Sequence, residues 1–495
     1  MPIYSTAGST LGFDISDSCL AAKSLPNYRV NWNRFKNFTT TLLRTRMAAV
    51  GVLIIVLFSA LAIAAPILTS HDPKVDVVAG AFSPPTWARF FPGYQDRSEN
   101  IAFQGLNVQT QPQSASVNKV SDQQVDVSLT SSSGPTTITV QKSLDFPYNG
   151  PPSRFQANLV LIPTGVSPTT PAFFTVYFQR TGENAWVLWK GNLTVSGQPV
   201  SPIIQMDSAE RRLVNALNIT SSTFNPAQII FDRQASYVYT VAVTFQTSAP
   251  TTVGVTAKDM TAQLFGTSYG LLGTDDGGHD LFAAFIYGAR VSLLVGLAAS
   301  ILGIVIGLVV GLVAGFLGGF VDEVLMRFND MILVIPTLPL IIVLLAVLSP
   351  NINNIILIIG LLGWNGFARV VRSQVLSLRE RPFIEAARAS GAGTTHILTR
   401  HIIPNIIAII YISLALSVPA AILTEAGLSF LGLFDPSAVS WGRTVNESLR
   451  GGTALGSLWW WVLPPGFAIA ILSLSFVLVG YGLDEMFNPK LRRRR

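Results

Sequence analysis

Six long apolar runs, each with few or no charged residues, constrain the fold of this chain more than any other feature. A helix needs about 17 to 25 apolar residues to cross the hydrocarbon core of a bilayer, and each run falls in or above that range. The runs lie at 47–68, 291–316, 321–348, 355–371, 406–433 and 459–483. Composition agrees, because 49% of the 495 residues are hydrophobic and only 12% are charged. The sequence therefore predicts a polytopic α-helical membrane protein with six transmembrane helices.

The basic residues indicate which side of the membrane each loop occupies. They cluster before the first transmembrane helix at 47–68, in the loop at 372–401 and in the C-terminal tail. Six crossings place all three clusters on one side, and basic loops stay in the cytoplasm. We therefore expect residues 1–46 and the basic tail at 486–495 to be cytoplasmic, in a multi-pass protein of the cell membrane. This distribution also explains the formal net charge of +6 without any binding of nucleic acid.

Several function classes lack their sequence signatures. Cys19 is the only cysteine, so an intrachain disulfide and a thiolate metal cluster are both excluded. No GxxxxGK[ST] phosphate loop is present, and no nucleophile, base and orienting group form a credible constellation. We expect the chain to be no enzyme by itself and to hold no metal.

The segment from 69 to 271 differs in character from the apolar runs around it. Short alternating or β-branched stretches, separated by turn-forming residues, lie at 125–130, 136–140, 157–163, 173–180, 185–195, 227–232 and 236–245. They predict an all-β, sandwich-like domain inserted between the first and second transmembrane helices. The topology places this insertion outside the cell, either as a passive cover or as a docking aid for a solute receptor.

The stretch from 381 to 405 is polar and basic although it lies between two apolar runs. Pro382 suits the first turn of a helix, and Gly391 and Gly393 suit its end. Thr394 or Thr395 suits the start of a second helix, which Pro404 would end or kink. The sequence therefore predicts a helix–turn–helix at the membrane surface.

This stretch resembles the EAA loop of ABC importer permeases. The residues that carry the resemblance are Glu385, Ala386, Ala387, Gly391, Ile402, Ile403 and Pro404, with isoleucine in place of the family's usual leucine before the proline. The stretches at 272–297, 428–442 and 460–471 resemble the dipeptide, oligopeptide and nickel permeases in particular. His279 replaces the usual arginine and Phe434 a common glycine. The resemblance covers about 30–73 and 264–495 but not the β insertion.

The resemblance implies a type I ABC importer permease fold, with a permease core at 272–485. It implies that Glu385, Ala386, Ala387, Gly391 and Pro404 form a loop that couples to an ATPase. The implied partners are a second, homologous permease, two ABC ATPase subunits that bind ATP and Mg, an extracytoplasmic solute-binding protein and the lipid bilayer. The implied solute is a peptide or a similar small molecule, and nickel chelates and oligosaccharides are alternatives.

Four ionisable residues stand close together just before the second apolar run, namely Asp275, Asp276, His279 and Asp280. Carboxylates and an imidazole in this spacing suit a divalent cation. Aspartates also cap turns and helix N-termini, and we favour that interpretation for this extracytoplasmic entrance segment. The paired histidines of the surface loop, His396 and His401, have no carboxylate at ligand spacing, so we expect them to lie at a surface or an interface.

Ionisable residues inside the apolar runs are candidates for a translocation path or a gate, because charges in a membrane are costly and usually functional or paired. Glu323 and Arg327 are one helical turn apart and are expected to pair, with Asp330 beside them. Glu425 is expected either to line the path or to bond to the partner subunit. Two rival functions are a membrane-anchored receptor with an outer β domain and a secondary transporter driven by an ion gradient.

Overall fold

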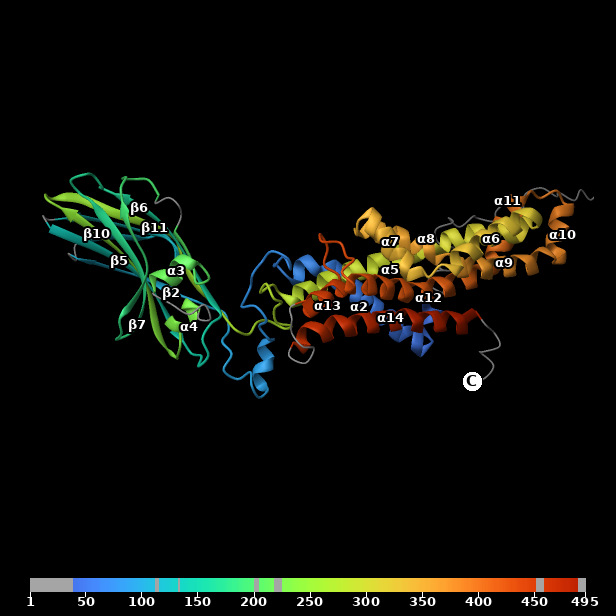
Figure 1. Cartoon of the computed structure of the whole chain (residues 1–495), viewed down its shortest axis with the longest axis horizontal. Coiled ribbons are helices and arrows are strands. Elements are labelled where there is room, and N and C mark those ends of the chain that lie inside the picture. The colour runs from blue at the N-terminus through green and yellow to red at the C-terminus, as the bar shows by residue number, and fades with distance from the viewer. Residues whose placement is uncertain are drawn as a thin grey trace, which may run out of the picture.

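The computed structural model describes residues 39–111, 115–131, 134–199, 204–217, 225–450 and 458–487. Most of the predicted cytoplasmic N-terminal segment, Cys19 and nearly all of the basic tail lie outside these ranges. In the described part, a β unit occupies one end of an elongated molecule and a bundle of long helices the rest (Figure 1).

The β unit consists of two antiparallel sheets. One has the strand order β3-β4-β11-β6-β9, with β1 beside β11, and the other has the order β2-β5-β10-β7-β8. The strands are β1 (Ile101–Ala102), β2 (Gln104–Gln111), β3 (Ala115–Lys119), β4 (Val125–Ser131), β5 (Gly134–Phe146), β6 (Arg154–Thr164), β7 (Ala172–Arg180), β8 (Ala185–Leu193), β9 (Ile204–Asp207), β10 (Ala235–Thr247) and β11 (Thr251–Phe265).

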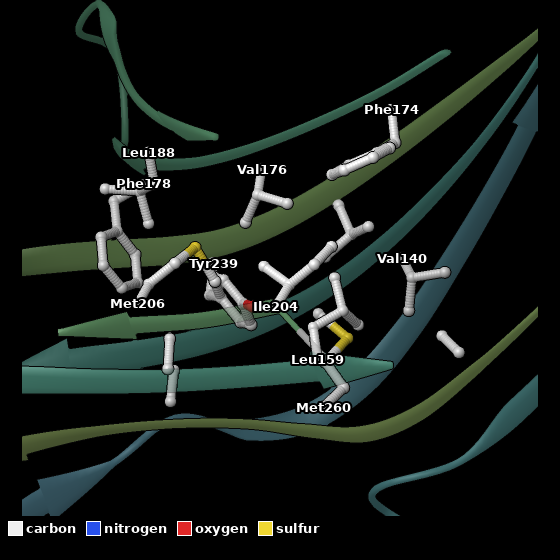
Figure 2. Packing of buried hydrophobic residues seen from close by; sticks show 14 of the residues in the cluster. Val140, Leu159, Phe174, Val176, Phe178, Leu188, Ile204, Met206, Tyr239 and Met260 are labelled. Atoms are coloured by element: carbon white, nitrogen blue, oxygen red, sulfur yellow. The ribbon is translucent and has the colours of Figure 1, made fainter. Parts of the chain in front are cut away.

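The sheets share one hydrophobic core, because alternate residues of each strand point to the same face. Burial alternates strictly along β6, and β7 repeats the pattern from Phe174 to Arg180. Figure 2 shows side chains of both sheets meeting in this core. Phe178 and Tyr239 come from one sheet and Leu159 and Met206 from the other, and all four are buried.

One predicted strand of the β unit is wrong. Residues 227–232 were expected to be extended, but Pro226–Ile230 form a short helix, α4. The side chain of Asn225 accepts a hydrogen bond from the backbone N–H of Ala227 at 2.9 Å, and Pro226 occupies the first helical turn. This capping overrides the β propensity of the isoleucines.

The fifteen-residue strand β11 was not predicted. A second short helix, α3 (Arg211–Ala216), lies beside β8.

Two linkers join the β unit to the helices, and they are hydrogen-bonded to each other. We call residues 77–100 and 266–280 together the neck. The N–H of Gly80 donates to the carbonyl of Gly266 at 3.1 Å, and the N–H of Ser83 donates to Thr274 Oγ1 at 2.9 Å. Asn100 accepts from the N–H of Gly266 at 2.8 Å and donates to the carbonyl of Val78 at 2.6 Å. These bonds make the neck a two-stranded connection rather than a single flexible tether.

The bundle contains both long helices and helices interrupted by turns. The longer elements are α2 (Arg46–Leu68), α5 (Leu281–Leu317), α6 (Gly319–Val334), α7 (Thr337–Leu348), α8 (Ile352–Gly363), α9 (Asn365–Arg379), α12 (Ile403–Phe430), α13 (Trp441–Arg450) and α14 (Trp459–Phe487). In the described part, five helical segments are long and apolar enough to cross a membrane, or six if the pair α6 and α7 counts as one span.

The predicted third span is not a straight helix. α6 and α7 meet at an angle of 87°. Pro336 lies at this break, as the N-cap of α7, and proline cannot donate the hydrogen bond that a continuous helix would need there. The second span also differs from its prediction, because α5 begins at Leu281 instead of 291 and runs for 37 residues. At 1.5 Å per residue it is about 55 Å long, which exceeds the hydrocarbon core.

α5 is the centre of the bundle and packs against α2, α8, α9 and α12. Four of its glycines, Gly303, Gly307, Gly311 and Gly315, recur at every fourth position and face the backbone of α8, α9 and the turn between them. A Cβ atom at Gly311 would lie 2.6 Å from the carbonyl oxygen of Ala368. Small residues at such spacing allow two helix backbones to approach closely in a membrane.

We predict that Gly311→Val lowers the stability of the bundle, because the new side chain meets backbone that can yield only if α5 and α9 separate. Overpacking of this kind costs about 1–3 kcal/mol or more. The matched control is Gly427→Val in α12, where an added Cβ meets no atom within 4 Å. Thermal unfolding of the purified chain in detergent measures both. Equal losses would show that the close approach of α5 and α9 contributes little.

Candidate functional site

The predicted surface loop lies at the end of the bundle farthest from the β unit, where Figure 1 labels α10 and α11. α10 spans Pro382–Ala389, with Pro382 in its first turn as predicted. Gly391 follows the helix with φ of +81°, and its N–H donates to the carbonyl of Arg388 at 2.9 Å. The N–H of Ala392 donates to the carbonyl of Ala387 at 3.0 Å. These two bonds form a Schellman motif, which confirms that Gly391 ends the helix.

The second helix of the loop differs from its prediction at its start, and of the two predicted roles of Pro404 the structure excludes a helix end. α11 (Thr394–Ile397) has Gly393 as its N-cap and no side-chain cap, so neither predicted threonine caps it. Pro404 does not end the helix either, because the chain continues through a π-helical turn, η2 (Leu398–Ile402), into α12. Pro404 lies in the first turn of α12, directly after the π turn. The widened turn accommodates a residue that lacks an N–H.

Buried isoleucines fix this loop to the rest of the bundle. Ile384 of α10, Ile397 of α11 and Ile402 of the π turn are each at most 2% exposed, and they share one cluster with Phe316 of α5 and Val375 of α9. Two arginines add polar contacts at the same place. Arg379 donates to the carbonyl of Phe316 at 3.3 Å, and the Arg388 guanidinium lies 5.2 Å from the centre of the Phe316 ring. These contacts hold the loop to the end of α5.

The outer face of the loop remains accessible. Glu385, Ala386 and Ala389 are exposed, and Phe383 is 43% exposed although it is large and apolar. Glu385 forms no ion pair with any residue that the structure describes. Small residues, one aromatic ring and one unpaired carboxylate make a surface that another protein can approach closely.

The ionisable residues of α6 pair with α9 and not with each other. The expected pair of Glu323 and Arg327 is wrong, because both side chains are exposed and no ion pair joins them in the described part of α6. Their neighbour Asp322 binds both Nε and Nη2 of Arg372, at 2.5 and 2.6 Å. Asp322 and Asp330 each have an arginine of α9 as a partner, whereas Glu323 forms no ion pair among the described residues.

Asp330 also finds its partner on α9, because it accepts a hydrogen bond from Arg369 at 2.5 Å. Two acidic residues of α6 thus bind two arginines of the helix that leads into the surface loop. These bonds tie α6 to the same end of the bundle as the loop.

Glu425 is buried, with 2% exposure, and belongs to a polar connection between α12 and α13. Its Oε1 accepts from Ser429 Oγ at 2.7 Å, and Ser440 Oγ donates to Ser429 Oγ at 3.4 Å. Ser440 in turn accepts from the N–H of Arg443 at 3.2 Å and thereby caps α13. Glu425 faces a cavity of only about 10 Å³ inside the chain, so this geometry favours a positioning role over direct contact with a solute.

A cavity that the sequence did not reveal lies deeper in the bundle. It has a volume of about 150 Å³ between α5, α7, α8 and α12, and Ser300, Thr337, Ser417 and Thr424 contribute its hydroxyl groups. The buried Ser300 hydroxyl has no hydrogen-bond partner among the described residues. The seven-residue spacing of Ser417 and Thr424 within an apolar run was the available signal, since it places both on one helix face.

The entrance segment adopts the capping geometry. Asp275 accepts hydrogen bonds from the N–H of Gly277 at 2.9 Å and of His279 at 2.8 Å, and its second oxygen lies 2.9 Å from His279 Nδ1. Asp280 caps α5 by accepting from the N–H of Phe282 at 2.9 Å. Within the described ranges, no group of three or more His, Cys, Asp or Glu side chains is arranged to hold a metal ion.

Comparison with known proteins gives consistent matches over the helical part. Residues 303–493 match the family described as "Binding-protein-dependent transport system inner membrane component". The dipeptide transport system permease protein of Bacillus subtilis (strain 168) is 38% identical over 222 residues, which cover 45% of this chain and 69% of that protein. The oligopeptide transport system permease protein of the same organism is 40% identical, over 45% of this chain and 72% of that protein.

We predict a pH-dependent effect of the cap at the start of α5. Burial raises the pKa of the Asp280 carboxyl, because desolvation disfavours its charged form. At a pH above the raised pKa, the buried negative charge of Asp280 lowers the free energy of unfolding. As the pH falls, the carboxyl is protonated and the free energy of unfolding recovers. Asp280→Asn keeps the cap without the charge, so its melting temperature should equal or exceed that of the wild type at neutral pH and lose the advantage in acid.

The control is Asp280→Ala, which removes both the charge and the cap and should be about 1 kcal/mol less stable than Asp280→Asn at every pH. Thermal unfolding in detergent from neutral to acidic pH measures all three proteins. An asparagine variant as unstable as the alanine variant would contradict the capping role.

Proposed function

The chain belongs to the ABC importer permeases described as binding-protein-dependent transport system inner membrane components, and on that premise we propose that it forms part of the path by which peptides enter the cell. It is a multi-pass membrane subunit and not an enzyme. Peptides are proposed because the similar proteins are named as dipeptide and oligopeptide permeases. Nickel chelates and oligosaccharides remain alternative solutes.

The observation that carries this proposal is the accessible face of α10, with its unpaired Glu385 and its Gly391 turn. We propose that an ABC ATPase subunit, which binds ATP and Mg, docks on this face. The cluster of Ile384, Ile397 and Phe316 would then transmit motion of the ATPase to α5. Since α5 also packs against α8, α9 and α12, such motion would reach the whole bundle.

The remaining subunits and the orientation follow from the same proposal. A second, homologous permease would pair with this chain, a second ATPase would bind that permease, and an extracytoplasmic binding protein would deliver the solute. We propose six crossings, with α6 and α7 as one broken span, so that both termini and the α10 surface would be cytoplasmic. The β unit, the entrance segment at 275–280 and the loop at 434–440 would then lie outside. The cavity beside Ser300 is a candidate section of the path.

We predict that Glu385→Lys reduces transport and solute-stimulated ATP hydrolysis in the reconstituted complex. Reversal of an unpaired charge should weaken an interface that depends on electrostatic complementarity. Glu210→Lys serves as a matched control, because Glu210 is equally charged and exposed but lies in the β unit. If the transport and ATPase rates of Glu385→Lys equal those of the control and of the wild type, the face of α10 takes no part in the mechanism.

A second pair of variants tests the turn itself. Gly391 has φ of +81°, whereas Gly393 has φ of −70°, and an added Cβ meets no atom within 4 Å at either position. Gly391→Ala should therefore cost about 1–2 kcal/mol of local backbone strain and reduce coupling, while Gly393→Ala should not. Similar ATPase rates in the two variants would show that the left-handed conformation is not required.

The orientation is tested with single cysteines in a Cys19→Ser background. We expect Thr252→Cys of β11 and Ser437→Cys to react with an impermeant thiol reagent in intact cells, and Thr394→Cys of α11 to react only after lysis. All three positions are exposed, so access to the reagent depends on sidedness. Labelling of Thr394→Cys from outside would overturn the six-crossing topology.

A further inference from the structure

The neck carries an exposed aromatic patch that the transport function does not explain. It consists of Trp87, Phe90, Phe91 and Leu271, whose exposed fractions are 37%, 88%, 53% and 58%. Phe90 ends the short 3₁₀ helix η1 (Thr86–Phe90). Clusters of large exposed apolar side chains on a protein surface mark contacts with other proteins or with membranes.

The patch has a fixed shape. The indole N–H of Trp87 donates to the carbonyl of Leu271 at 2.8 Å, which joins the two linkers of the neck. The rings of Trp87 and Phe91 meet edge to face, with centroids 6.2 Å apart. The N–H groups of Thr86, Ala88 and Phe91 donate to backbone carbonyls. Few polar groups of the patch would therefore lose hydrogen bonds to water if this surface became buried.

The position of the patch indicates what covers it. Trp87 packs against Trp459, the first residue of α14, with ring centroids 5.4 Å apart. From Trp459, the residues Leu463, Phe467 and Ile471 follow at four-residue spacing along the candidate span and are 47%, 60% and 42% exposed. Residues four apart share a helix face. In Figure 1 the light-blue helix of the neck accordingly lies beside the end of α14 that is nearer to the β unit.

The charges near the patch are also compatible with lipid. Arg89 is the only charged residue in the sequence from 86 to 91. Its guanidinium forms an ion pair with Glu99 and lies 5.6 Å from the centre of the Tyr148 ring. The patch thus presents aromatic rings without an unpaired charge, at the level where a membrane span begins. Aromatic residues concentrate at this level of membrane proteins.

We propose that the aromatic patch rests in the bilayer interface, with Phe90 and Phe91 inserted between the lipid headgroups and the acyl chains. The bilayer is the occupant that fits, because the patch continues the exposed apolar face of α14 at its membrane boundary. The neck then has a lipid contact in addition to its bonds with the helices, and this contact limits tilting of the β unit. The proposal requires only that α14 spans the membrane, and it is independent of the solute and of transport.

The test places an environment-sensitive NBD fluorophore on Phe90→Cys in the full chain with Cys19→Ser, reconstituted in vesicles. The matched control is Val117→Cys, an apolar residue of β3 that is 48% exposed. Val117 of β3 pairs with Val127 of β4, and Val127 pairs in turn with Val255 of β11. Val255 lies ten residues before the end of β11 at the neck, so position 117 lies well away from the neck. We expect the fluorophore at position 90 to show blue-shifted emission and to be quenched by lipids brominated near their headgroups. The fluorophore at position 117 should instead be quenched by aqueous iodide.

A second variant tests whether the apolar surface of the patch causes the insertion. Phe91→Asp in the labelled chain should shift the emission from position 90 towards that from position 117, because a charge beside the ring opposes insertion. Phe90 and Phe91 are 88% and 53% exposed, so neither change removes a buried core residue. Quenching of position 90 by iodide and not by brominated lipid would overturn the proposal. Protection from both quenchers only after addition of a partner permease or a binding protein would overturn it in favour of a protein interface.

Discussion

The close approach of α5 to α8 and α9 is the contact on which the rest of the bundle depends. Lipid tails are as apolar as leucine side chains, so the hydrophobic effect gives transmembrane helices little reason to associate. Gly307 and Gly311 replace that driving force by letting the backbones touch, which adds dispersion contacts along both helices. The C-terminal end of α5 is therefore fixed against the helix that precedes the surface loop. A rigid connection between loop and bundle is what a coupling element needs.

Several charged side chains of the bundle are bonded to a neighbouring helix near the end of a helix or at a break. Asp322, near the turn between α5 and α6, and Asp330, near the break before α7, both bind arginines of α9. Glu425 bonds to Ser429, whose hydroxyl contacts the cap of α13. Unpaired charges in a low-dielectric region are costly, so such pairs also fix which helices are neighbours. These bonded charges of the described bundle thus position its helices.

The β unit is structurally separate from this machinery and is joined to it by the neck. Its two sheets enclose their own core, which includes Phe155, Phe178 and Phe231. The linkers at Gly80 and Gly266 are hydrogen-bonded to each other, and Trp460 and Trp461 pack with Phe82 and Tyr94 beneath them. A domain joined by two paired linkers has fewer orientations than one on a single tether. Its placement relative to the membrane is therefore a property of the neck.

Local chemistry explains what the sequence by itself determined. The apolar runs place the long helices, because span length and bilayer thickness are matched. Gly391 and Pro382 mark the ends of α10, since each depends only on its own backbone conformation. Alternating burial identifies strands such as β6 and β7 for the same reason. The resemblance of the surface loop to a coupling loop likewise rests on residues within one short stretch.

Tertiary structure alone decided the features that need a partner distant in sequence. Nothing local distinguishes Asp322 from Glu323, but only Asp322 faces Arg372 of α9. Pro336 and Pro404 share one local chemistry, yet the chain bends by 87° at the first and passes through a π turn into α12 at the second. The cavity beside Ser300 and the contact of Trp87 with Trp459 arise only when separate segments meet. A sequence pattern specifies the face of an element, whereas packing specifies what that face contacts.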